Sequence, residues 1–359
     1  MNDRNSKYLI TGGCGFIGSC LIRELLKNNQ TVINIDKISY ASNKDAVGSK
    51  NLDKYTLISS DINEKDLVKN ILDEHNPDYV VHLAAESHVD RSIDNPESFI
   101  NSNIVGTYTL LEASYSFWKN QEGNKKNNFR FIYVSTDEVY GSLNKMDKRF
   151  TEDSHYKPNS PYAASKASGD LLARSWFQTY DFPIITTNSS NNYGKWQFPE
   201  KLIPLVLKKC LKNENIPVYG NGSQIRDWIN VKDHVAAIFF VLEKGRIGEN
   251  YNIGASNEIS NIDLVNLLCS LMDDIRPRDE GNYSDLITFV SDRPGHDFRY
   301  AINASKIKKE FNWKPKETFE TGLLKTVKWY LNNINLYKKS INKNFEFKNF
   351  NKLFKKEML

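Results

Sequence analysis

Two adjacent acidic residues follow a strand-like apolar run in FRFIYVSTDEVYG, residues 129–141. The run ends in Thr136, Asp137 and Glu138, and taking carboxylates out of water is unfavourable unless they are paired or put to use. Neighbouring carboxylates in different environments can have separated pKa values, so that one is protonated while the other is ionised. The pair therefore predicts a site that presents an acid and a base together. The alternative is two acids that cap a loop after the strand.

A tyrosine and a lysine four residues apart, Tyr162 and Lys166, occur in NSPYAASKASGDLL and therefore lie on one face of a predicted helix. An unperturbed tyrosine has a pKa near 10, and lowering it to about 7 requires roughly 4 kcal/mol of preferential stabilisation of the phenolate. A lysine ammonium and an oxidised nicotinamide can supply that stabilisation. The Thr136 hydroxyl can bind the same substrate oxygen, so we predict a catalytic tyrosine. The alternative is an ordinary Tyr and Lys on a solvated helix.

Glycines recur with G-x-x-G-x-x-G spacing in TGGCGFIGS, residues 11–19, between a strand-like run and a helix-like segment. Gly12, Gly15 and Gly18 allow a tight turn and let a pyrophosphate approach the backbone N–H groups at the positive end of the helix. Such a motif by itself can serve only close packing. Its place between strand and helix favours a dinucleotide site.

Acidic residues follow the next two apolar runs. Asp36 ends TVINID, at about the distance where a carboxylate receives the adenosine ribose hydroxyls, and an acid there repels a 2′-phosphate. NAD is therefore favoured over NADP, although the neighbouring Lys37 weakens that argument. In SSDI, Asp61 and Ile62 are placed where they can meet an adenine edge. The alternative for Asp61 is a simple turn.

Strand-like and helix-like segments alternate through the first 190 residues. The strand-like runs are 7–13, 31–36, 79–85, 129–136 and 183–190, and the helix-like segments are 18–29, 66–77, 103–118 and 165–180. This alternation predicts an α/β fold with a doubly wound, Rossmann-type parallel sheet covered by helices on each side. Beyond it, Gly, Pro and Asn punctuate shorter elements, which predict a smaller α/β substrate-binding lobe over the strand ends.

The length of 359 residues and the charge distribution support a division into three parts. We expect an NAD-binding domain at 1–190, a nucleotide-sugar-binding lobe at 191–335, partly intertwined with the first, and a basic tail at 336–359. Residues 331–359 hold seven lysines and two glutamates, or +5, whereas the whole chain carries +4. The rest therefore has about −1, which is no nucleic-acid-binding footprint. The tail is either a short amphipathic helix or a solvated, partly ordered segment.

The sequence also indicates where the protein acts. No apolar run approaches the roughly 18 residues of a membrane span, and the first residues lack the apolar segment of a secretory signal. The four cysteines, Cys14, Cys20, Cys210 and Cys269, have no ligand-like spacing, which suits reduced thiols and argues against a zinc site. We expect a cytoplasmic protein with no membrane span, no nucleic-acid partner and no metal.

Several separated blocks carry a resemblance to a known family. GGCGFIGS, VSTDEVYG and YAASK together resemble the extended short-chain dehydrogenase/reductase superfamily, in which a Tyr and a Lys promote hydride transfer between a nucleotide sugar and NAD. Sugar epimerases of that superfamily lack the Asp-Glu pair. STDEVYG, with HLAAESHVDRSI, SNNYGKWQFPEKLIP, RDWINVKDH and DRPGHDFRYAI, is similar to the dTDP-glucose 4,6-dehydratase family. The likeness covers about residues 7–332 and leaves out the tail.

The resemblance implies a reaction, dehydration of dTDP-glucose to dTDP-4-keto-6-deoxyglucose through bound NAD. Oxidation at C4 acidifies the proton on C5, and elimination of water across C5 and C6 then needs a base for that proton and an acid for the departing hydroxyl. By resemblance, Asp137 is the acid toward the C6 hydroxyl and Glu138 is the base at C5. Thr136, Tyr162 and Lys166 complete the catalytic set, and the hydride returns to C6.

The resemblance also assigns binding residues. Those near NAD are Gly12, Gly15, Phe16, Ile17, Gly18, Asp36, Lys37, Asp61, Ile62, Leu83, Ala84, Ala85, Ser87, Ser102, Tyr162, Lys166 and Asn192. Those near the nucleotide sugar are Ser87, Thr136, Asn191, Lys201, Leu202, Pro217, Val218, Tyr219, Arg226, Asn261, Arg293 and His296. Arg226 and Arg293 suit a diphosphate because a planar guanidinium matches phosphate oxygens, although either can instead form a structural ion pair. The lone His88 has no ligand-spaced partner, and we assign it a packing or substrate-lining place and no catalytic role.

Other activities on the same fold stay open from the sequence. They are a 4,6-dehydratase for a UDP sugar, a 4-epimerase and a decarboxylase; the acid pair speaks against epimerisation but does not decide the nucleotide base. A non-catalytic NAD-binding regulator would have no need for Thr136, Tyr162, Lys166 and both acids together. Family members commonly pair as homodimers through two helices of the dinucleotide domain, here 103–118 and 165–180. Either helix can instead be covered within one chain.

Overall fold

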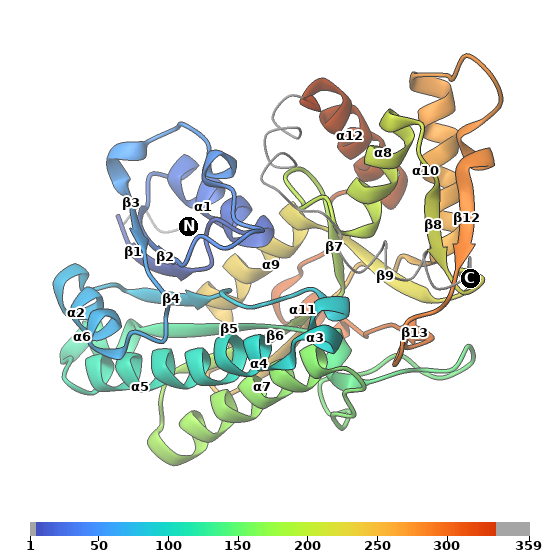
Figure 1. Cartoon of the computed structure of the whole chain (residues 1–359). Helices are drawn as coiled ribbons and strands as arrows, with labels where there is room; N and C mark the ends of the chain where they lie inside the picture. Colours follow the sequence, from blue (N-terminus) through green and yellow to red (C-terminus); the bar gives the residue numbers. More distant parts are fainter. Residues whose placement is uncertain (1–4, 335–359) are drawn as a thin grey trace.

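A seven-stranded parallel sheet forms the centre of the molecule in the computed structural model, which describes residues 5–334 (Figure 1). In sheet order its strands are β10 (Asn250–Ile253), β6 (Ile184–Ser189), β5 (Arg130–Thr136), β4 (Tyr79–His82), β1 (Lys7–Thr11), β2 (Thr31–Asp36) and β3 (Tyr55–Ser59). The chain order reverses between β1 and β4, and ligands of such sheets bind outside the carboxyl ends of the strands at this point. The predicted doubly wound sheet is confirmed.

Helices cover both faces of the sheet. One face carries α2 (Lys65–His75), α5 (Gly106–Lys119) and α7 (Pro161–Tyr180), and the other carries α1 (Phe16–Lys27), α9 (Val231–Lys244) and α11 (Ser305–Phe311). Side chains alternate between the two apolar cores as strand geometry requires. Leu9 and Ile33 point into the core under α2, whereas Ile10 and Val32 point into the core under α1. Burial on both faces explains the unbroken apolar runs in the sequence.

The two predicted parts of the chain are interleaved. β10, α9 and α11 all come from the range 191–335, yet they pack on the large sheet, where Asn250 pairs with Thr186. The segments 7–11, 31–36 and 184–189 form strands where the sequence predicts them. The sequence does not predict β10 as part of this sheet. The boundary near residue 190 stays a prediction, and the predicted basic tail lies outside the described residues.

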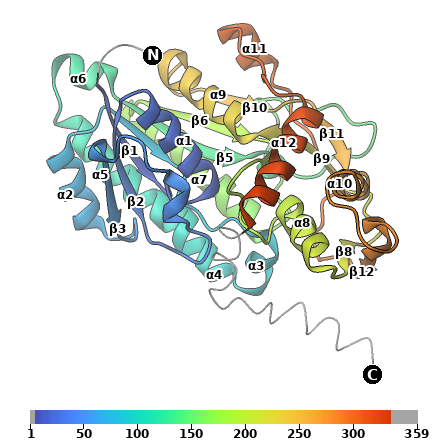
Figure 2. The ribbon, with the colours of Figure 1, turned by 90° about the horizontal axis from the view of Figure 1, so that it is seen from above.

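The lobe holds two small sheets and its own helices. β9 (Ile225–Asn230) pairs with β7 (Asn191–Tyr193), β11 (Glu258–Ser260) and β13 (Arg299–Tyr300), while β8 (Ile216–Tyr219) pairs with β12 (Ile287–Val290). α8 (Leu202–Lys212), α10 (Asn261–Ile275) and α12 (Phe319–Asn332) pack around a separate apolar core. Figure 2 shows α8, α10, β8 and β12 together on the side away from β1, β2 and β3. The predicted smaller α/β lobe is therefore present.

Short elements connect these layers. They are η1 (Lys44–Val47), η2 (Leu52–Lys54), α3 (Val89–Asp94), α4 (Pro96–Phe99), η3 (Ile100–Val105), α6 (Gly123–Asn128), η4 (Asp137–Tyr140) and η5 (Tyr283–Leu286). The helix predicted over 103–118 differs at its start, because the chain is π-helical up to Val105 and α-helical only from Gly106. Of the helices between residues 5 and 334, none combines the length and apolar character that crossing a bilayer requires.

Candidate active site

The turn between β1 and α1 closes one end of a groove along the carboxyl ends of the strands. Gly12 has a φ of +71°, and a Cβ there would lie 2.7 Å from the backbone of Ala84. A Cβ on Gly18 would lie 2.4 Å from the carbonyl oxygen of Gly12. α1 begins at Phe16, which lines the groove, so the free N–H groups of its first turn are presented to a ligand there. The turn fits a pyrophosphate, as the glycine spacing predicts.

The carboxylate of Asp36 is held at the end of β2. Its Oδ2 accepts a hydrogen bond from the N–H of Cys14 and its Oδ1 accepts one from the N–H of Ile38, both at 2.8 Å. The neighbouring Lys37 forms an ion pair with Glu86 at 2.9 Å. Since that lysine has a carboxylate of its own, it does not neutralise Asp36, and the site favours a free ribose over a 2′-phosphate.

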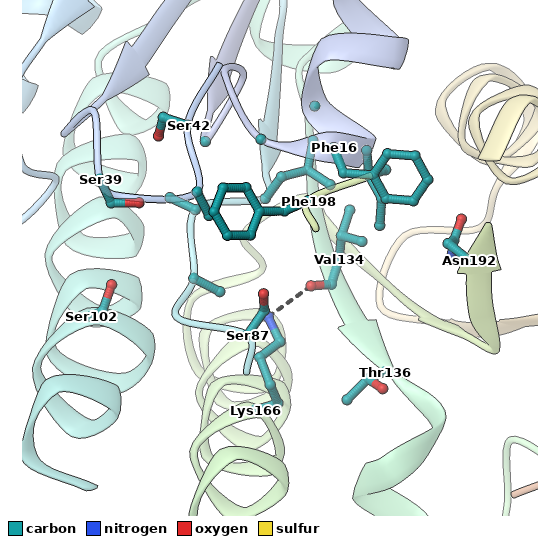
Figure 3. Close-up of a pocket in the computed structure, with 18 of the residues that line it drawn as sticks. Phe16, Ser39, Ser42, Ser87, Ser102, Val134, Thr136, Lys166, Asn192 and Phe198 are labelled. Carbon is teal, nitrogen blue, oxygen red and sulfur yellow. Dashed lines mark hydrogen bonds between the residues drawn. The ribbon is translucent and has the colours of Figure 1, made fainter. Parts of the chain in front are cut away.

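The groove gathers every residue that the sequence places near NAD. Figure 3 shows Phe16 and Asn192 on one side of it and Ser102 on the opposite side, with Lys166 between. The lining also includes residues that the sequence did not single out, among them Ser39, Ser42 and Phe198. The assignment of each residue to a cofactor contact stays a prediction.

The end of β5 and the first turns of α7 bring Thr136, Tyr162 and Lys166 together. α7 begins after Ser160, whose side chain caps the helix, so the tyrosine falls in its first turn. The side chains of Tyr162 and Thr136 share a hydrogen bond. One turn further, Lys166 Nζ donates to the carbonyl oxygen of Val134 at 2.8 Å (Figure 3). The structure thus brings the three residues together, and their catalytic roles stay a prediction.

Burial controls the pKa values of these groups. It lowers the pKa of Lys166 to about 8, while the charge of Asp170 acts in the opposite direction. Burial and the charge of Glu138 raise the pKa of Tyr162, and the hydrogen bond with Thr136 opposes them. A further positive charge is therefore required for the tyrosine to act as a base near neutral pH.

The acid pair begins η4, directly after β5. Asp137 Oδ2 and Glu138 Oε2 are both buried atoms with no hydrogen-bond partner within residues 5–334. Burial and the charge of Glu138 raise the pKa of Asp137 well above its usual range. Burial also raises the pKa of Glu138, but the charges of Arg293, Arg226 and Lys201 oppose that shift. Asp137 is thus the member of the pair that holds its proton more strongly, and Glu138 is the member that ionises more readily.

A second pocket lies on the lobe side of the acid pair. It shares part of its lining with the groove, namely Glu138, Asn191, Gln197, Glu200 and Lys201. Residues that the sequence places near the nucleotide sugar and that line this pocket are Asn191, Lys201, Leu202, Pro217, Val218, Tyr219, Arg226, Asn261, Arg293 and His296. Ser87 and Thr136, which the sequence also places there, line the groove instead. Glu138 therefore lies at the junction of the two pockets.

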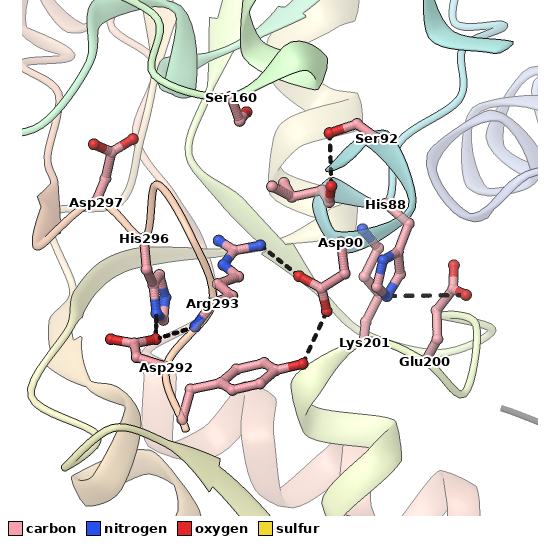
Figure 4. A network of polar contacts seen from close by, with 12 residues as sticks. His88, Asp90, Ser92, Ser160, Glu200, Lys201, Asp292, Arg293, His296 and Asp297 are labelled. Carbon is pink, nitrogen blue, oxygen red and sulfur yellow. Dashed lines mark hydrogen bonds and ion pairs between the residues drawn. The ribbon is translucent and has the colours of Figure 1, made fainter. Parts of the chain in front are cut away.

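The two arginines reach the second pocket with different partners. Arg226 is buried, donates to the carbonyl oxygen of Asp297 at 2.9 Å and lies over the Tyr300 ring at 4.2 Å. Arg293 forms an ion pair with Asp90 at 2.9 Å (Figure 4). The structural ion pair that the sequence left open is thus present for Arg293, inside the lining of the pocket.

Two carboxylates of the site were missed in the sequence. Asp90 lies within AESHVDR, and Glu200 lies within FPEKLIP, but neither segment indicates its partners. Glu200 accepts hydrogen bonds from the Tyr40 hydroxyl at 2.9 Å and from Arg91 Nε at 3.2 Å. Because these partners are more than 100 residues away in the sequence, no local pattern could reveal them.

His88 lines the second pocket, as its interpretation as a lining residue implies. Burial, followed by the charge of Lys201, lowers the pKa of His88 to about 3, so the ring is neutral at physiological pH. Lys201 Nζ itself donates to the carbonyl oxygen of Ser87 at 2.7 Å. In the part of the chain that the structure describes, no group of His, Cys, Asp or Glu side chains is arranged to hold a metal ion.

The sheet, the glycine turn and the buried Tyr162–Lys166 pair define a short-chain dehydrogenase/reductase of the extended, nucleotide-sugar type. A family model described as GDP-mannose 4,6 dehydratase matches residues 9–326. The chain is 51% identical over 337 residues to dTDP-glucose 4,6-dehydratase 1 of Escherichia coli (strain K12), covering 91% of this chain and 93% of that protein. It is also 51% identical to dTDP-glucose 4,6-dehydratase of Haemophilus influenzae, covering 90% and 98%. The chain belongs to the dTDP-glucose 4,6-dehydratase family.

Solved structures agree with this assignment. DesIV, a dTDP-glucose 4,6-dehydratase from Streptomyces venezuelae solved with NAD bound, has a TM-score of 0.85 and 38% identity, covering 93% of this chain and 99% of that chain. A UDP-glucose 4-epimerase from Thermotoga maritima has a TM-score of 0.80 at 26% identity, covering 91% and 99%. Because this epimerase shares the fold, the architecture by itself does not separate the two activities.

Proposed function

We propose that this protein is a hydro-lyase that converts dTDP-glucose to dTDP-4-keto-6-deoxyglucose and keeps NAD bound through each turnover. The observation that carries the proposal is the position of Asp137 and Glu138. Asp137 lines the dinucleotide groove and Glu138 lies where the groove meets the second pocket, and each acid has a buried oxygen with no hydrogen-bond partner among residues 5–334. A buried polar atom without a partner is unfavourable, and a substrate that bonds to it removes this cost.

The first step uses the residues at the groove. Thr136 holds the C4 oxygen of the sugar, and Tyr162 accepts the proton of the C4 hydroxyl while Lys166 stabilises the phenolate. Bound NAD would supply a hydride acceptor for C4 and a hydride donor for C6, and its positive charge would lower the pKa of the tyrosine. The residues that would hold it are those of the glycine turn, with Asp36 at the ribose.

The second step uses the acid pair. The C4 ketone acidifies C5, and Glu138 accepts the C5 proton as the C5–C6 double bond forms. Asp137 donates its proton to the C6 hydroxyl, which leaves as water when the C6–O bond breaks. Glu138 then returns its proton to C5 as C6 is reduced. Tyr162 has gained one proton and Asp137 has lost one, so proton exchange with solvent restores both residues, and no net proton is gained or lost over the cycle.

A substrate comparison tests this function. The purified protein is incubated separately with dTDP-glucose, UDP-glucose and UDP-galactose without added NAD, and the products are identified by mass and NMR. We expect loss of water from the dTDP substrate only. Interconversion of the UDP sugars would instead indicate an epimerase, and water loss from UDP-glucose at an equal rate would refute the preference for dTDP.

A homodimer is also part of this proposal. α5 and α7 contact each other and lie side by side on one face (Figure 1). Large apolar side chains on these helices and the preceding η3 are exposed: Ile100, Val105, Tyr108 and Leu171. Such a patch is typical of an interface, here with a second copy. Leu171→Arg should shift the sedimentation mass from dimer to monomer, whereas a monomeric parent would contradict the proposal.

The four free cysteines, all buried, support a reducing, cytoplasmic location.

A further inference from the structure

The carboxylate of Asp90 lies in the lining of the second pocket and accepts hydrogen bonds from two side chains on the opposite side of the pocket. Asp90 Oδ1 accepts from Arg293 Nη1 at 2.9 Å, and its Oδ2 accepts from the Tyr219 hydroxyl at 3.1 Å (Figure 4). Asp90 lies on α3, which follows β4 of the large sheet, whereas Tyr219 ends β8 and Arg293 follows β12 in the lobe. The contacts therefore join the two parts of the molecule across the pocket.

A carboxylate here needs an explanation, because the pocket is proposed to take a diphosphate. An unpaired negative charge in the lining would repel that ligand. Burial has the largest single effect on the pKa of Asp90 and raises it, but the combined opposing effects, of which the charge of Arg293 is the largest, leave the pKa lowered overall. Asp90 is therefore ionised at neutral pH, and its charge is neutralised by the arginine.

The geometry of Arg293 shows which part of the guanidinium remains available. The group has five N–H donors in a planar fork, and Asp90 engages Nη1. Nε is buried and has no hydrogen-bond partner within residues 5–334. A guanidinium bound to an acid through Nη1 can still present its Nε edge to a second anion, and a phosphate accepts such a fork in bidentate fashion.

We propose that Asp90 is a positioning residue for the diphosphate, which turns the Nε edge of Arg293 and the side chain of Tyr219 toward the ligand. The proposal rests on the proposed function, since it assumes a nucleoside diphosphate sugar in the second pocket. In the alternative role, Asp90 is a rival anion: it competes with the diphosphate for Arg293, and the diphosphate displaces it from the arginine on binding. The two roles predict opposite effects of removing the charge.

The test measures ligands with and without a diphosphate on the NAD-loaded protein. dTDP and thymidine are titrated by calorimetry into the parent, Asp90→Asn and Asp90→Glu. A positioning role predicts about tenfold weaker dTDP binding in both variants, because a charge-assisted contact is lost or displaced, and unchanged thymidine binding. The KM for dTDP-glucose should rise by a similar factor while kcat and bound NAD stay near parental values. Glu97→Gln, which removes an exposed acid on the adjacent α4, is the control and should change none of these.

Each other outcome overturns the inference. Tighter dTDP binding by Asp90→Asn would identify a rival anion, and equal weakening of dTDP and thymidine, or parental dTDP binding, would exclude positioning of the diphosphate. If Asp90 acts through Arg293, the double variant Asp90→Asn/Arg293→Gln should bind dTDP only slightly more weakly than Arg293→Gln alone. Measurements on the parent protein distinguish failure of the proposed function from failure of this inference. If the parent binds dTDP but does not dehydrate dTDP-glucose, the proposed function is wrong, and the comparison of dTDP binding between parent and variants still decides the role of Asp90.

Discussion

Replacing Glu138 by Gln should separate the two halves of the reaction. The amide is nearly isosteric but cannot accept the C5 proton, whereas the groups that act on C4, Thr136, Tyr162 and Lys166, are left in place. General-base catalysis is worth about 10²- to 10⁴-fold, so we expect kcat for the 4-keto-6-deoxy product to fall within that range. Oxidation at C4 should continue.

The cost to stability should be small because two effects oppose each other. The charge of Glu138 raises the pKa of Asp137, so the amide relieves an unfavourable like-charge contact between buried groups. The same change removes the favourable electrostatic attraction between Glu138 and the cations Arg293, Arg226 and Lys201. We expect the free energy of unfolding to change by no more than about 1 kcal/mol.

Reduced cofactor and isotope exchange report the two halves separately. With dTDP-glucose, Glu138→Gln should accumulate enzyme-bound NADH, seen by its absorbance, and should wash solvent deuterium into C5 far more slowly than the parent. Tyr162→Phe is the contrasting variant and should form little NADH, because it lacks the base for the first step. If Glu138→Gln forms product at nearly the parental rate, or exchanges C5 as quickly, Glu138 is not the base.

Three further outcomes follow from the described contacts. Burial lowers the pKa of Lys166 to about 8, so the ammonium is lost as the pH rises through this value and C4 oxidation should slow above it; a rate that stays flat to about pH 10 contradicts this. Gly169→Ala should destabilise the protein by about 1–3 kcal/mol in urea unfolding, since its Cβ would lie 2.0 Å from the Tyr133 hydroxyl, and an unchanged midpoint would refute that clash. Tyr330→Phe removes hydrogen bonds to carbonyl oxygens of the 194–197 loop and should lower the free energy of unfolding by about 1 kcal/mol; an unchanged free energy of unfolding would show that those bonds do not contribute to stability.

Local features of the site could be predicted from the sequence because they depend on neighbours in the chain. The glycine turn needs close approach within a few residues, as the contact between Gly18 and the Gly12 carbonyl shows. Tyr162 and Lys166 share a helix face through a fixed four-residue spacing. The alternation of apolar runs with helix-like segments predicts a parallel sheet for a similar reason, because strands that are buried on both faces carry apolar side chains on both faces.

Features that depend on distant segments could not be predicted in the same way. β10 joins the large sheet after an excursion of about 60 residues through the lobe, and its four residues, NYNI, carry no signal of that partner. Asp90 lies within the segment HLAAESHVDRSI, yet its partner Arg293 is 203 residues away. Such pairs are set by how the lobe folds back over the sheet, and the lobe sequence does not specify that geometry locally.

The same limit applies to the division of labour between the two acids. From the sequence, Asp137 and Glu138 are equivalent neighbours at the end of one strand, and only a resemblance assigns the acid and the base. In the structure, burial raises both pKa values, but the three lobe cations, Arg226, Arg293 and Lys201, oppose the shift of Glu138. Arg226 also opposes the shift of Asp137, but Glu138 is opposed by all three cations, so the proposed division of roles follows from the greater positive charge that the lobe brings to Glu138. A variant that removes one of these cations should raise the pKa of Glu138 and move the acidic limb of C5 exchange to higher pH, even though the acid pair itself is intact.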